Sequence, residues 1–404
     1  MPRPQHLPVL ATCRFHFGAG FHFAVLVLCL ALGFAEVHAA SPSVQSLIRG
    51  EWVWPSGIAF DVKVVGRYAY VAGGPGGLAV IDVSDPANCV RVGTLDSSDT
   101  AFGVAVSGNF AYMAMNGFQV VNIGSPSNCV LVGHYFEGGD IRDVAVVGNR
   151  AYLAIGVAGL QVIDVSNPTN CIRLGGLGMS SGPGVGVAVS GHYAYVAESW
   201  AGLQVYDVSN PTNIVRVGGY STSGYEYYAY RVAVSGNYAY VANGYSGLQV
   251  IDVTNPTNCV RVGGYNTGGL AVGVTVSGNY AYVADYDGGL EVIDVSNPTL
   301  PMRVGGTDTS GLAFGVAVAA DRIYVADARA GLLVLPTVRD FQFTVRVDAE
   351  TNMPFTLEAA TDLSAPMPWT PLVTTNVPVM PFDFVDFDVK LTNKPQKFYR
   401  VRQP

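Results

Sequence analysis

The stretch from Gly247 to Ala284 decides the fold, and it reads GLQVIDVTNPTNCVRVGGYNTGGLAVGVTVSGNYAYVA. Within it lie four short runs rich in apolar and β-branched residues: GLQVIDV, CVRVGGY, GVTVSG and YAYVA. The pairs Asn-Pro, Gly-Gly and Gly-Asn that separate these runs are typical of turns. Gly278-Asn279, between the last two runs, predicts a two-residue hairpin of type I′. The stretch therefore predicts four short strands in succession.

The same pattern recurs along the chain at a nearly constant interval. The central tyrosine of the YAYVA run occurs seven times, 40 to 45 residues apart, at Tyr70, Tyr112, Tyr152, Tyr195, Tyr240, Tyr282 and Tyr324. A period of about 40–45 residues with four strands per repeat is typical of a propeller blade. We therefore expect an all-β, seven-bladed β-propeller.

One strand is missing from the last repeat. Counted from the inner to the outer strand, each repeat has a GVTVSG-like, a YAYVA-like, a GLQVIDV-like and a CVRVGGY-like strand. The first three occur in seven copies, but the seventh copy runs into Leu335-Pro336 without a CVRVGGY-like strand. A candidate replacement is Leu47–Trp52, which precedes the first inner strand at Ile58. Pairing with the last copy would close the ring and remove free sheet edges. An open solenoid is the alternative, but it does not require that a strand missing from the last copy be matched by an extra strand at the N-terminus.

The third strands and the turns after them resemble the LVIVD-repeat family of β-propeller proteins. The matching pieces are LQVIDVSNPTN at Leu160, LQVYDVSNPTN at Leu203 and LEVIDVSNPTL at Leu290, within residues 46–336. The resemblance implies the propeller fold, and it brings no catalytic residues to this chain.

After Val338 the repeat pattern gives way to short alternating runs. Pro and Thr-Asn turns separate them, so they predict a small β-rich module. LEAATDLSAPMPWTPL and the terminal FYRV resemble a short C-terminal β-module of secreted bacterial proteins. The expected strands are Phe341–Val347, Pro354–Glu358, Trp369–Thr374, Phe382–Val389 and Phe398–Val401.

The N-terminus has the pattern of a secretory signal peptide. Arg3 and Arg14 precede an apolar run, and Val37-His38-Ala39 offers a small-residue cleavage site. The run is shorter than the roughly 20 apolar residues that a membrane span needs. We therefore expect a signal peptide at 1–39, the propeller at 40–337 and a C-terminal β-rich module at 338–404. The protein is expected to be exported to the periplasm, cell surface or extracellular space, with no transmembrane segment after cleavage.

The charge of the chain argues against one class of partner. The formal net charge is −8, and no Lys/Arg cluster is present. Nucleic-acid binders need a basic face, so we expect no nucleic-acid partner. Four of the six histidines precede the predicted cleavage site. This leaves His134 and His192, too few for a histidine-rich metal centre.

Five aspartates occupy one position of the repeat, just before a Ser/Thr-(Asn/Asp)-Pro turn. Asn122 takes the same position in another copy, so the position needs a side-chain oxygen and not a charge. Such an oxygen accepts hydrogen bonds from the following turn. We therefore assign a structural role to Asp82, Asp164, Asp207, Asp252 and Asp294.

Four cysteines follow the predicted cleavage site, and each begins the outer strand of a different copy. With strands about 4.8 Å apart, equivalent outer positions of neighbouring blades lie on the order of 15 Å apart. A disulfide needs Cα atoms within about 7 Å. We therefore predict free, packed thiols at Cys89, Cys129, Cys171 and Cys259.

The two faces of the predicted ring differ in sequence. One face, called here the constant face, repeats the turns SGN and SNPTN, whereas the loops of the other, the variable face, differ between copies. Loops on a rigid scaffold often carry binding residues, and exposed Tyr and Trp are typical anchors. An alternative is that some of these rings only plug the channel mouth or pack against loops. The candidate binding residues are Trp200, Tyr225, Tyr227, Tyr245, Tyr286 and Glu198.

These observations favour a non-catalytic scaffold that binds a protein or a glycan through the variable face, without a cofactor. The competing class is a lyase or hydrolase that uses carboxylates and a tyrosine at the channel mouth. A raised pKa at Glu198 or Asp285 would favour the enzyme. Glu198, Asp285 and Asp287 also offer oxygen ligands for Ca²⁺, which takes 6–8 of them, but no complete calcium-loop spacing is present.

Overall fold

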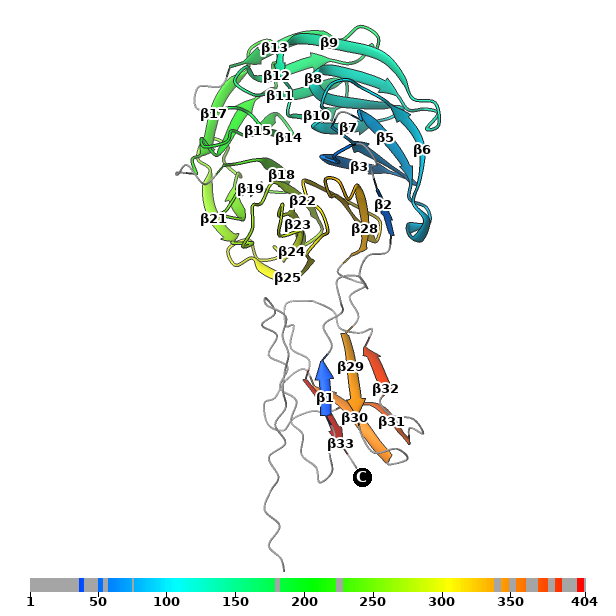
Figure 1. Cartoon of the computed structure of the whole chain (residues 1–404). Coiled ribbons are helices and arrows are strands. Elements are labelled where there is room, and N and C mark those ends of the chain that lie inside the picture. The colour runs from blue at the N-terminus through cyan, green and yellow to red at the C-terminus, as the bar shows by residue number, and fades with distance from the viewer. Residues whose placement is uncertain are drawn as a thin grey trace, which may run out of the picture. The chain divides into compact units, whose positions relative to one another are not determined.

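The computed structural model describes residues 36–39, 50–53, 57–74, 76–178, 182–222 and 228–337, together with five strands after residue 342. The chain divides into two units, one of them Val44–Thr337 and the other Met1–Ser43 with Val338–Pro404. The first unit is a ring of seven antiparallel sheets (Figure 1). The predicted seven-bladed β-propeller is therefore confirmed.

The blades are numbered in chain order, and their strands run from the channel to the rim. Blade 1 is β3 (Asp61–Val65), β4 (Tyr68–Ala72), β5 (Leu78–Asp82) and β6 (Val90–Leu95), with the 3₁₀ turn η1 (Pro86–Asn88) before β6. Blade 2 is β7 (Gly103–Ser107), β8 (Phe110–Asn122) and β9 (Val130–Asp140). Blade 3 is β10 (Asp143–Val147), β11 (Arg150–Ile155), β12 (Gly159–Asp164) and β13 (Ile172–Leu177).

Blades 4 to 6 repeat the four-strand arrangement. Blade 4 is β14 (Gly186–Ser190), β15 (Tyr193–Ala197), β16 (Leu203–Asp207) and β17 (Val215–Tyr220). Blade 5 is β18 (Arg231–Ser235), β19 (Tyr238–Ala242), β20 (Leu248–Asp252) and β21 (Val260–Tyr265). Blade 6 is β22 (Gly273–Ser277), β23 (Tyr280–Ala284), β24 (Leu290–Asp294) and β25 (Met302–Thr307).

Blade 7 takes its outer strand from the other end of the chain. It consists of β26 (Gly315–Ala319), β27 (Arg322–Ala326), β28 (Leu332–Pro336) and β2 (Gly50–Trp52). The pairs Gly50↔Val334 and Trp52↔Leu332 make β2 antiparallel to β28, and the Trp52 side chain packs on the core between blades 7 and 1. Closure by the N-terminal strand is therefore confirmed over these three residues, whereas Leu47–Arg49 lie outside the described part.

The hydrophobic core lies between neighbouring blades. The tyrosine of each YAYVA-type run is 3–4% exposed, in all seven blades. Tyr70 of blade 1, for example, packs with Val104 and Met113 of blade 2 in one cluster of buried side chains. Because every repeat supplies both sides of such an interface, the ring is held by one contact pattern repeated around the axis.

The hairpins between the first and second strands differ from the predicted type. A type I′ turn has positive φ at both central residues. Here the first central residue has positive φ, as in Gly108 at 55° and Gly278 at 58°, whereas Asn109 and Asn279 do not. A single positive φ at the first position belongs to type II′. The type I′ prediction is therefore wrong, because the Gly-Asn pair satisfies either turn.

In the part of the second unit that the structure describes, five strands follow the propeller and one precedes it. β29 (Phe343–Asp348), β30 (Pro354–Ala360), β31 (Thr370–Asn376), β32 (Phe382–Asp386) and β33 (Phe398–Arg402) overlap the five segments expected to be strands, with somewhat different ends. They form the sheets β1-β29-β32 and β31-β30-β33, where β1 is Glu36–Ala39. The strand β1 thus comes from the segment predicted to end the signal peptide.

Candidate functional site

The site is built on the turns between the second and third strands, which lie on the variable face. In blade 4 the turn is Glu198 to Gly202, closed by the Glu198 N–H donating to the Gly202 carbonyl at 2.8 Å. Blades 5 to 7 repeat this hydrogen bond from Asn243, Asp285 and Asp327. Each turn therefore presents its side chains from the same backbone frame.

The second residue of each turn fixes the frame to the next blade. Ser199 forms a bridge with Ala229, and Tyr286 forms the equivalent bridge with Ala313. This residue has positive φ, for instance 40° at Ser199 and 52° at Tyr286, where blade 5 has Gly244. A bulky residue in that region is strained. The bridge therefore fastens each of these turns to the next blade at some conformational cost.

The first residue of each turn is buried and not exposed. Asp285 is 0% exposed and accepts hydrogen bonds from the Thr267 hydroxyl and, at 3.0 Å, from the Gly269 N–H. Asp327 accepts equivalent bonds from Thr309 and Gly311. These carboxylates therefore clamp the loop that enters their own blade.

Glu198 is one of the candidate binding residues of the variable face, but its side chain is buried and only 1% exposed. It accepts a hydrogen bond from the hydroxyl of Tyr206, in the third strand of its own blade. Among the described residues, no group of three or more His, Cys, Asp or Glu side chains is arranged to hold a metal ion. Glu198, Asp285 and Asp287 are thus not brought together as calcium ligands.

The buried carboxylates do have the raised pKa values that would accompany catalysis. Burial raises the pKa of Glu198 and of Asp327, and it raises that of Asp285 to about 6. Burial alone explains the direction, because desolvation disfavours the charged form. Each of the three carboxylates is also sealed from solvent and hydrogen-bonded within the protein. Their pKa values therefore do not mark an accessible acid or base.

The third residue of the turn is where aromatic rings reach solvent. Trp200 is 49% exposed in blade 4 and Tyr245 is 58% exposed in blade 5. Trp200 meets Tyr228 edge to face at 6.2 Å between ring centroids, and Tyr228 meets Tyr230 in the same way. Burial raises the pKa of Tyr230, with further contributions from Tyr228 and Tyr245. These four rings are called here the aromatic patch.

The sequence predicted part of this patch. Trp200 and Tyr245 were expected to share one surface, whereas Tyr228 and Tyr230, which connect them, were missed as site residues. The feature of the sequence that could have indicated Tyr228 and Tyr230 is the high tyrosine content of the segment before β18. The other two expected anchors, Tyr225 and Tyr227, lie outside the described residues.

Tyr286 belongs to a different cluster, at the mouth of the channel. Its ring packs edge to face on Phe314 at 5.3 Å, and Phe314 packs on Phe60 at 4.9 Å. Phe60 in turn lies 5.6 Å from Phe102, which carries the Arg142 guanidinium over its ring. These rings come from blades 6, 7, 1 and 2. They match the alternative in which aromatic side chains plug the mouth.

Below these rings, charged side chains cross the channel. The first residue of the inner strand is Gly in four blades, but it is Asp61 in blade 1, Asp143 in blade 3 and Arg231 in blade 5. Arg231 pairs with Asp143 and donates to the Phe102 carbonyl at 3.2 Å. Asp61 and Asp143 also accept the N–H groups of Val104 and Val187 in the next blades. Charged side chains therefore occupy part of the channel between the inner strands.

The constant face has a structural explanation for its repetition. In blades 1 and 3 to 6 the aspartate that ends the third strand accepts the N–H two residues on, as Asp252 does from Thr254 at 2.8 Å, and Asn122 does the same in blade 2. Asn255 then accepts from Thr257. His192, in the blade 4 hairpin, gives its carbonyl to the Val208 N–H. The turn role predicted for the repeated aspartates is confirmed.

The cysteines also belong to the constant-face turns. All four are free thiols, as predicted, and each donates to the carbonyl of the proline three residues earlier, as Cys259 does to Pro256 at 3.4 Å. Burial raises the pKa of these thiols, that of Cys89 to about 11. They are therefore packed and unreactive at neutral pH.

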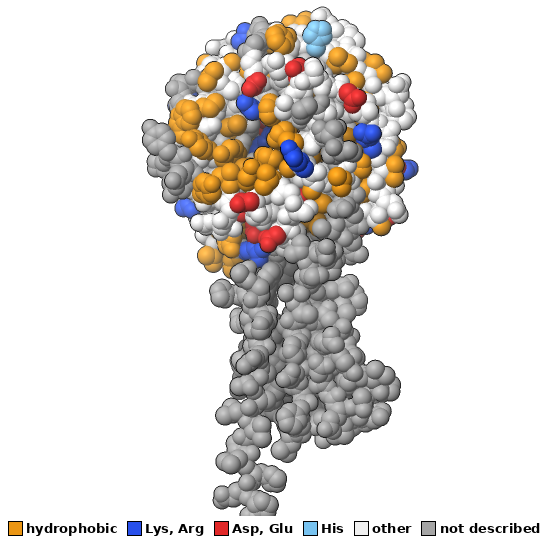
Figure 2. Space-filling model, in the orientation of Figure 1, with side chains coloured by type: hydrophobic (Ala, Val, Ile, Leu, Met, Phe, Trp, Pro, Cys, Tyr) orange, Lys and Arg blue, Asp and Glu red, His pale blue; other side chains and the backbone are white. Residues whose placement is uncertain are grey.

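Figure 2 shows one face of the ring, on which hydrophobic side chains gather around the centre with basic side chains among them. Within the described ranges, no helix is long and apolar enough to span a membrane.

Comparison with known proteins identifies the repeat. The profile of the LVIVD repeat matches residues 56–97, 100–136, 138–175, 181–222, 227–267 and 268–309, which together make up more than half of the chain. The chain belongs to the LVIVD repeat family. The six matched LVIVD repeats coincide with blades 1 to 6, and blade 7, which the N-terminal strand completes, lies outside them. No curated protein sequence matches the chain.

Solved propellers share the fold of this LVIVD-repeat chain at low sequence identity. The WD40 repeats of RRP9 superpose with a TM-score of 0.60 at 9% identity, covering 74% of this chain and 99% of that one. U3-55K gives 0.61 at 8% identity, with 73% and 100% covered. The Cps50 (Swd1) propeller of Myceliophteria thermophila gives 0.57 at 9% identity, with 71% and 98% covered. These similarities show the fold alone.

Proposed function

We propose that this chain is an exported, non-catalytic scaffold that binds a protein or a glycan through its variable face. In this proposal residues 1–39 are removed as a signal peptide, and residues 338–404 form a separate β-rich module. The observation that carries the proposal is the aromatic patch, in which Trp200 and Tyr245 are about half exposed on turns closed by backbone hydrogen bonds.

Exposed aromatic rings on a fixed frame are suited to recognition. They lower solubility, so a surface without a partner gains nothing from them. Two rings held by backbone bridges also lose little entropy when a partner covers them. The constant face, by contrast, repeats its turns for reasons of packing. The variable face is therefore the better candidate for the working surface.

A carboxylate-dependent lyase or hydrolase is the weaker candidate. Glu198, Asp285 and Asp327 have raised pKa values, but each is at most 1% exposed and hydrogen-bonded within the fold. A general acid or base must come within hydrogen-bond reach of its substrate. Clamped carboxylates of this kind support a structural role.

The proposal is tested with the secreted protein on a glycan array and against a protein library. A Trp200→Ala/Tyr245→Ala double variant should lose at least about 100-fold in affinity for the partner found, because each hot-spot ring contributes about 2 kcal/mol or more. Asn258→Ala, on the constant face, is the matched control and should bind normally. Unchanged affinity in the double variant, or loss in the control, would reject the variable face.

A further inference from the structure

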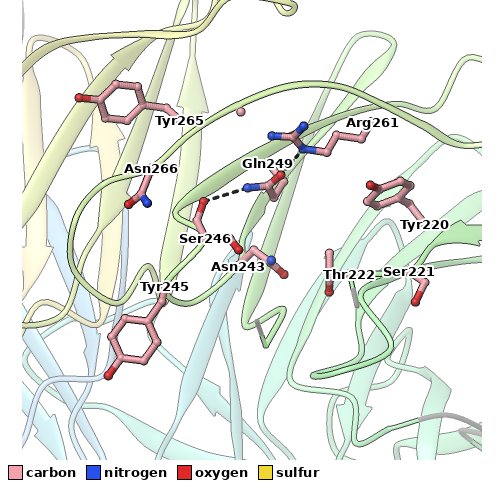
Figure 3. Close-up of a pocket in the computed structure, with 11 residues that line it drawn as sticks. Tyr220, Ser221, Thr222, Asn243, Tyr245, Ser246, Gln249, Arg261, Tyr265 and Asn266 are labelled. Atoms are coloured by element: carbon pink, nitrogen blue, oxygen red, sulfur yellow. Dashed lines mark hydrogen bonds between the residues drawn. The ribbon is translucent and has the colours of Figure 1, made fainter. Parts of the chain in front are cut away.

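A pocket of about 550 Å³ opens between blades 4 and 5, beside the aromatic patch (Figure 3). Tyr220 at the end of β17 and the loop after it line one side, and the blade 5 turn with parts of β20 and β21 lines the other. Its volume lies in the range of roughly 300–1,000 Å³ found for small-molecule sites. The pocket is therefore large enough for a ligand rather than for a few water molecules.

The floor of the pocket contains an unpaired hydrogen-bond acceptor. Asn243 lines the pocket and is 2% exposed, yet its Oδ1 accepts no hydrogen bond from the part of the chain that the structure describes. In blades 6 and 7 the same position holds Asp285 and Asp327, whose oxygens accept hydroxyl and N–H groups of the entering loop. Leaving a buried acceptor unpaired is unfavourable for folding. Among the described residues, blade 5 therefore carries a buried acceptor that is available to a bound donor.

The rest of the lining is neutral and aromatic. The pocket has three tyrosines, Tyr220, Tyr245 and Tyr265, among Ser, Thr, Asn and Gln side chains, and no described lining residue is acidic. Such a surface offers aromatic faces and several hydrogen-bonding groups without a net negative charge. It suits a ligand with many hydroxyls and an apolar face.

Arg261, the one cation among the described lining residues, does not select an anion. Arg261 donates through Nε to the Gln249 side chain, which in turn donates to the Ser246 carbonyl at 2.8 Å (Figure 3). The same pair recurs as Gln204–Arg216 in blade 4, so it belongs to the repeat and not to the pocket. The chain also carries a formal charge of −8, which repels anionic ligands.

We propose that this pocket binds one pyranose ring of a neutral glycan. A sugar hydroxyl donates to Asn243 Oδ1, and the apolar face of the ring packs on the exposed Tyr245 side chain. The inference rests on the proposed function and narrows it, since it selects a glycan over a protein and places one sugar unit beside the aromatic patch. The sugar site is placed at blade 5 because, among blades 4 to 7, only blade 5 has an amide side chain at the buried turn position.

The test uses saturation-transfer NMR and calorimetric titration of the mature protein. The probes are D-glucose, D-galactose, D-mannose and N-acetyl-D-glucosamine, each free in solution. At least one sugar should bind, and Asn243→Leu and Tyr245→Ala should each weaken its binding at least about 10-fold. Asn258→Ala, on the constant face of the same blade, should leave the affinity unchanged. Binding by none of the four sugars, or full binding by Tyr245→Ala and Asn243→Leu, overturns the proposal.

Thermal unfolding distinguishes a binding role of Asn243 from a structural one, because replacing a structural Asn243 would lower the melting temperature. Asn243→Leu removes an unpaired buried acceptor with little change of volume, so it should melt no lower than the wild type while losing the sugar. If that variant does not fold, the exposed Tyr245→Ala decides the outcome alone. A partner whose binding is lost in Trp200→Ala but kept in both pocket variants rejects the sugar site and leaves the variable face standing.

Discussion

Four neighbouring blades place three kinds of buried polar side chain at one turn position, Glu, Asn and Asp, and the differences show which substitutions the repeat accepts. Glu198 accepts from a tyrosine of its own blade, and Asp285 and Asp327 accept from the entering loop, whereas the Asn243 oxygen has no partner among the described residues. The backbone frame is the same in all four. Chemistry at this position can therefore change without disturbing the ring.

Asp285 gives a pH dependence of known sign. Burial raises the pKa of Asp285 from 3.8 to about 6, so the folded protein holds this proton more tightly than the unfolded chain does. Its stabilising contribution is present below about pH 4 and is lost as the pH rises through about 6. Relative to Asp285→Asn, the wild type should therefore lose up to about 3 kcal/mol of unfolding free energy between pH 4 and pH 7. Urea unfolding of both proteins at the two pH values measures this.

Asp252 is the matched control, because its shift has the opposite sign. Hydrogen bonds from Thr254 lower the pKa of Asp252 in the exposed constant-face turn. Its contribution is present above the unfolded pKa and is lost as the pH falls, so Asp252→Asn should differ most from the wild type at neutral pH. If the two variants change with pH in the same direction, the assignment of Asp285 as a desolvated clamp is wrong.

Part of the residue-level site could be predicted from the sequence. Exposure of Trp200 and Tyr245 could be predicted because both stand between small residues in short turns. Burial of Glu198 could not, since a carboxylate in a turn is normally solvated and its partner, Tyr206, lies eight residues away. Alignment of the repeats indicates a shared role for this position, because a polar residue follows directly after the second strand in four blades: Glu198, Asn243, Asp285 and Asp327.

At the level of elements, the outer strands of blades 1 to 5 each pack closely against the constant-face turn of the next blade. A Cβ atom on the glycine in the middle of the strand would clash with the carbonyl of the next blade's constant-face proline. The pairs are Gly93–Pro126, Gly133–Pro168, Gly175–Pro211, Gly218–Pro256 and Gly263–Pro298. Close backbone approach therefore explains why both the GG strand and the SNPTN turn repeat.

The contact between Gly218 and Pro256 can be tested by adding one methyl group. In Gly218→Ala the new Cβ meets backbone rather than a movable side chain, so blades 4 and 5 must separate. Overpacking of this kind destabilises by about 1–3 kcal/mol. Chemical denaturation measures the loss. Gly178→Ala is the control, because a Cβ there meets nothing within 4 Å, and a loss in this variant equal to that of Gly218→Ala would contradict the interlock.

The strands themselves were predictable, and their exceptions were not. A YAYVA run followed by a GLQVIDV run predicts two strands because a Gly-containing turn separates them. In blade 2 this turn is replaced by Met115-Asn116-Gly117, and the two strands become the single strand β8. The ion pair of Arg231 with Asp143 across the channel could not be predicted either, because Asp143 belongs to a blade two positions away.

At the level of the whole molecule, ring closure depends on three residues of β2. A chain that begins at Pro55 leaves β28 as an open edge, with Leu332 and Val334, now 0% exposed, facing solvent. Unpaired edges lose stability and invite aggregation. We expect a loss of at least about 2 kcal/mol, or roughly 4 °C or more in Tm. A chain that begins at Arg49 keeps β2 and should unfold as the wild type does; equal unfolding of both shortened chains would contradict closure by β2.

The pairing of β2 with β28 also determines how the propeller responds to tension. Because Gly50 pairs with Val334 and Trp52 with Leu332, the chain enters β2 and leaves β28 at the same end of the ladder. Opposed pulling on the two flanking segments would load these pairs one after another, as in a zipper, rather than all together in shear. Mechanical strength would then be that of one hydrogen-bonded pair at a time. Under load, the ring would open at this seam while the other six blades kept all their strands.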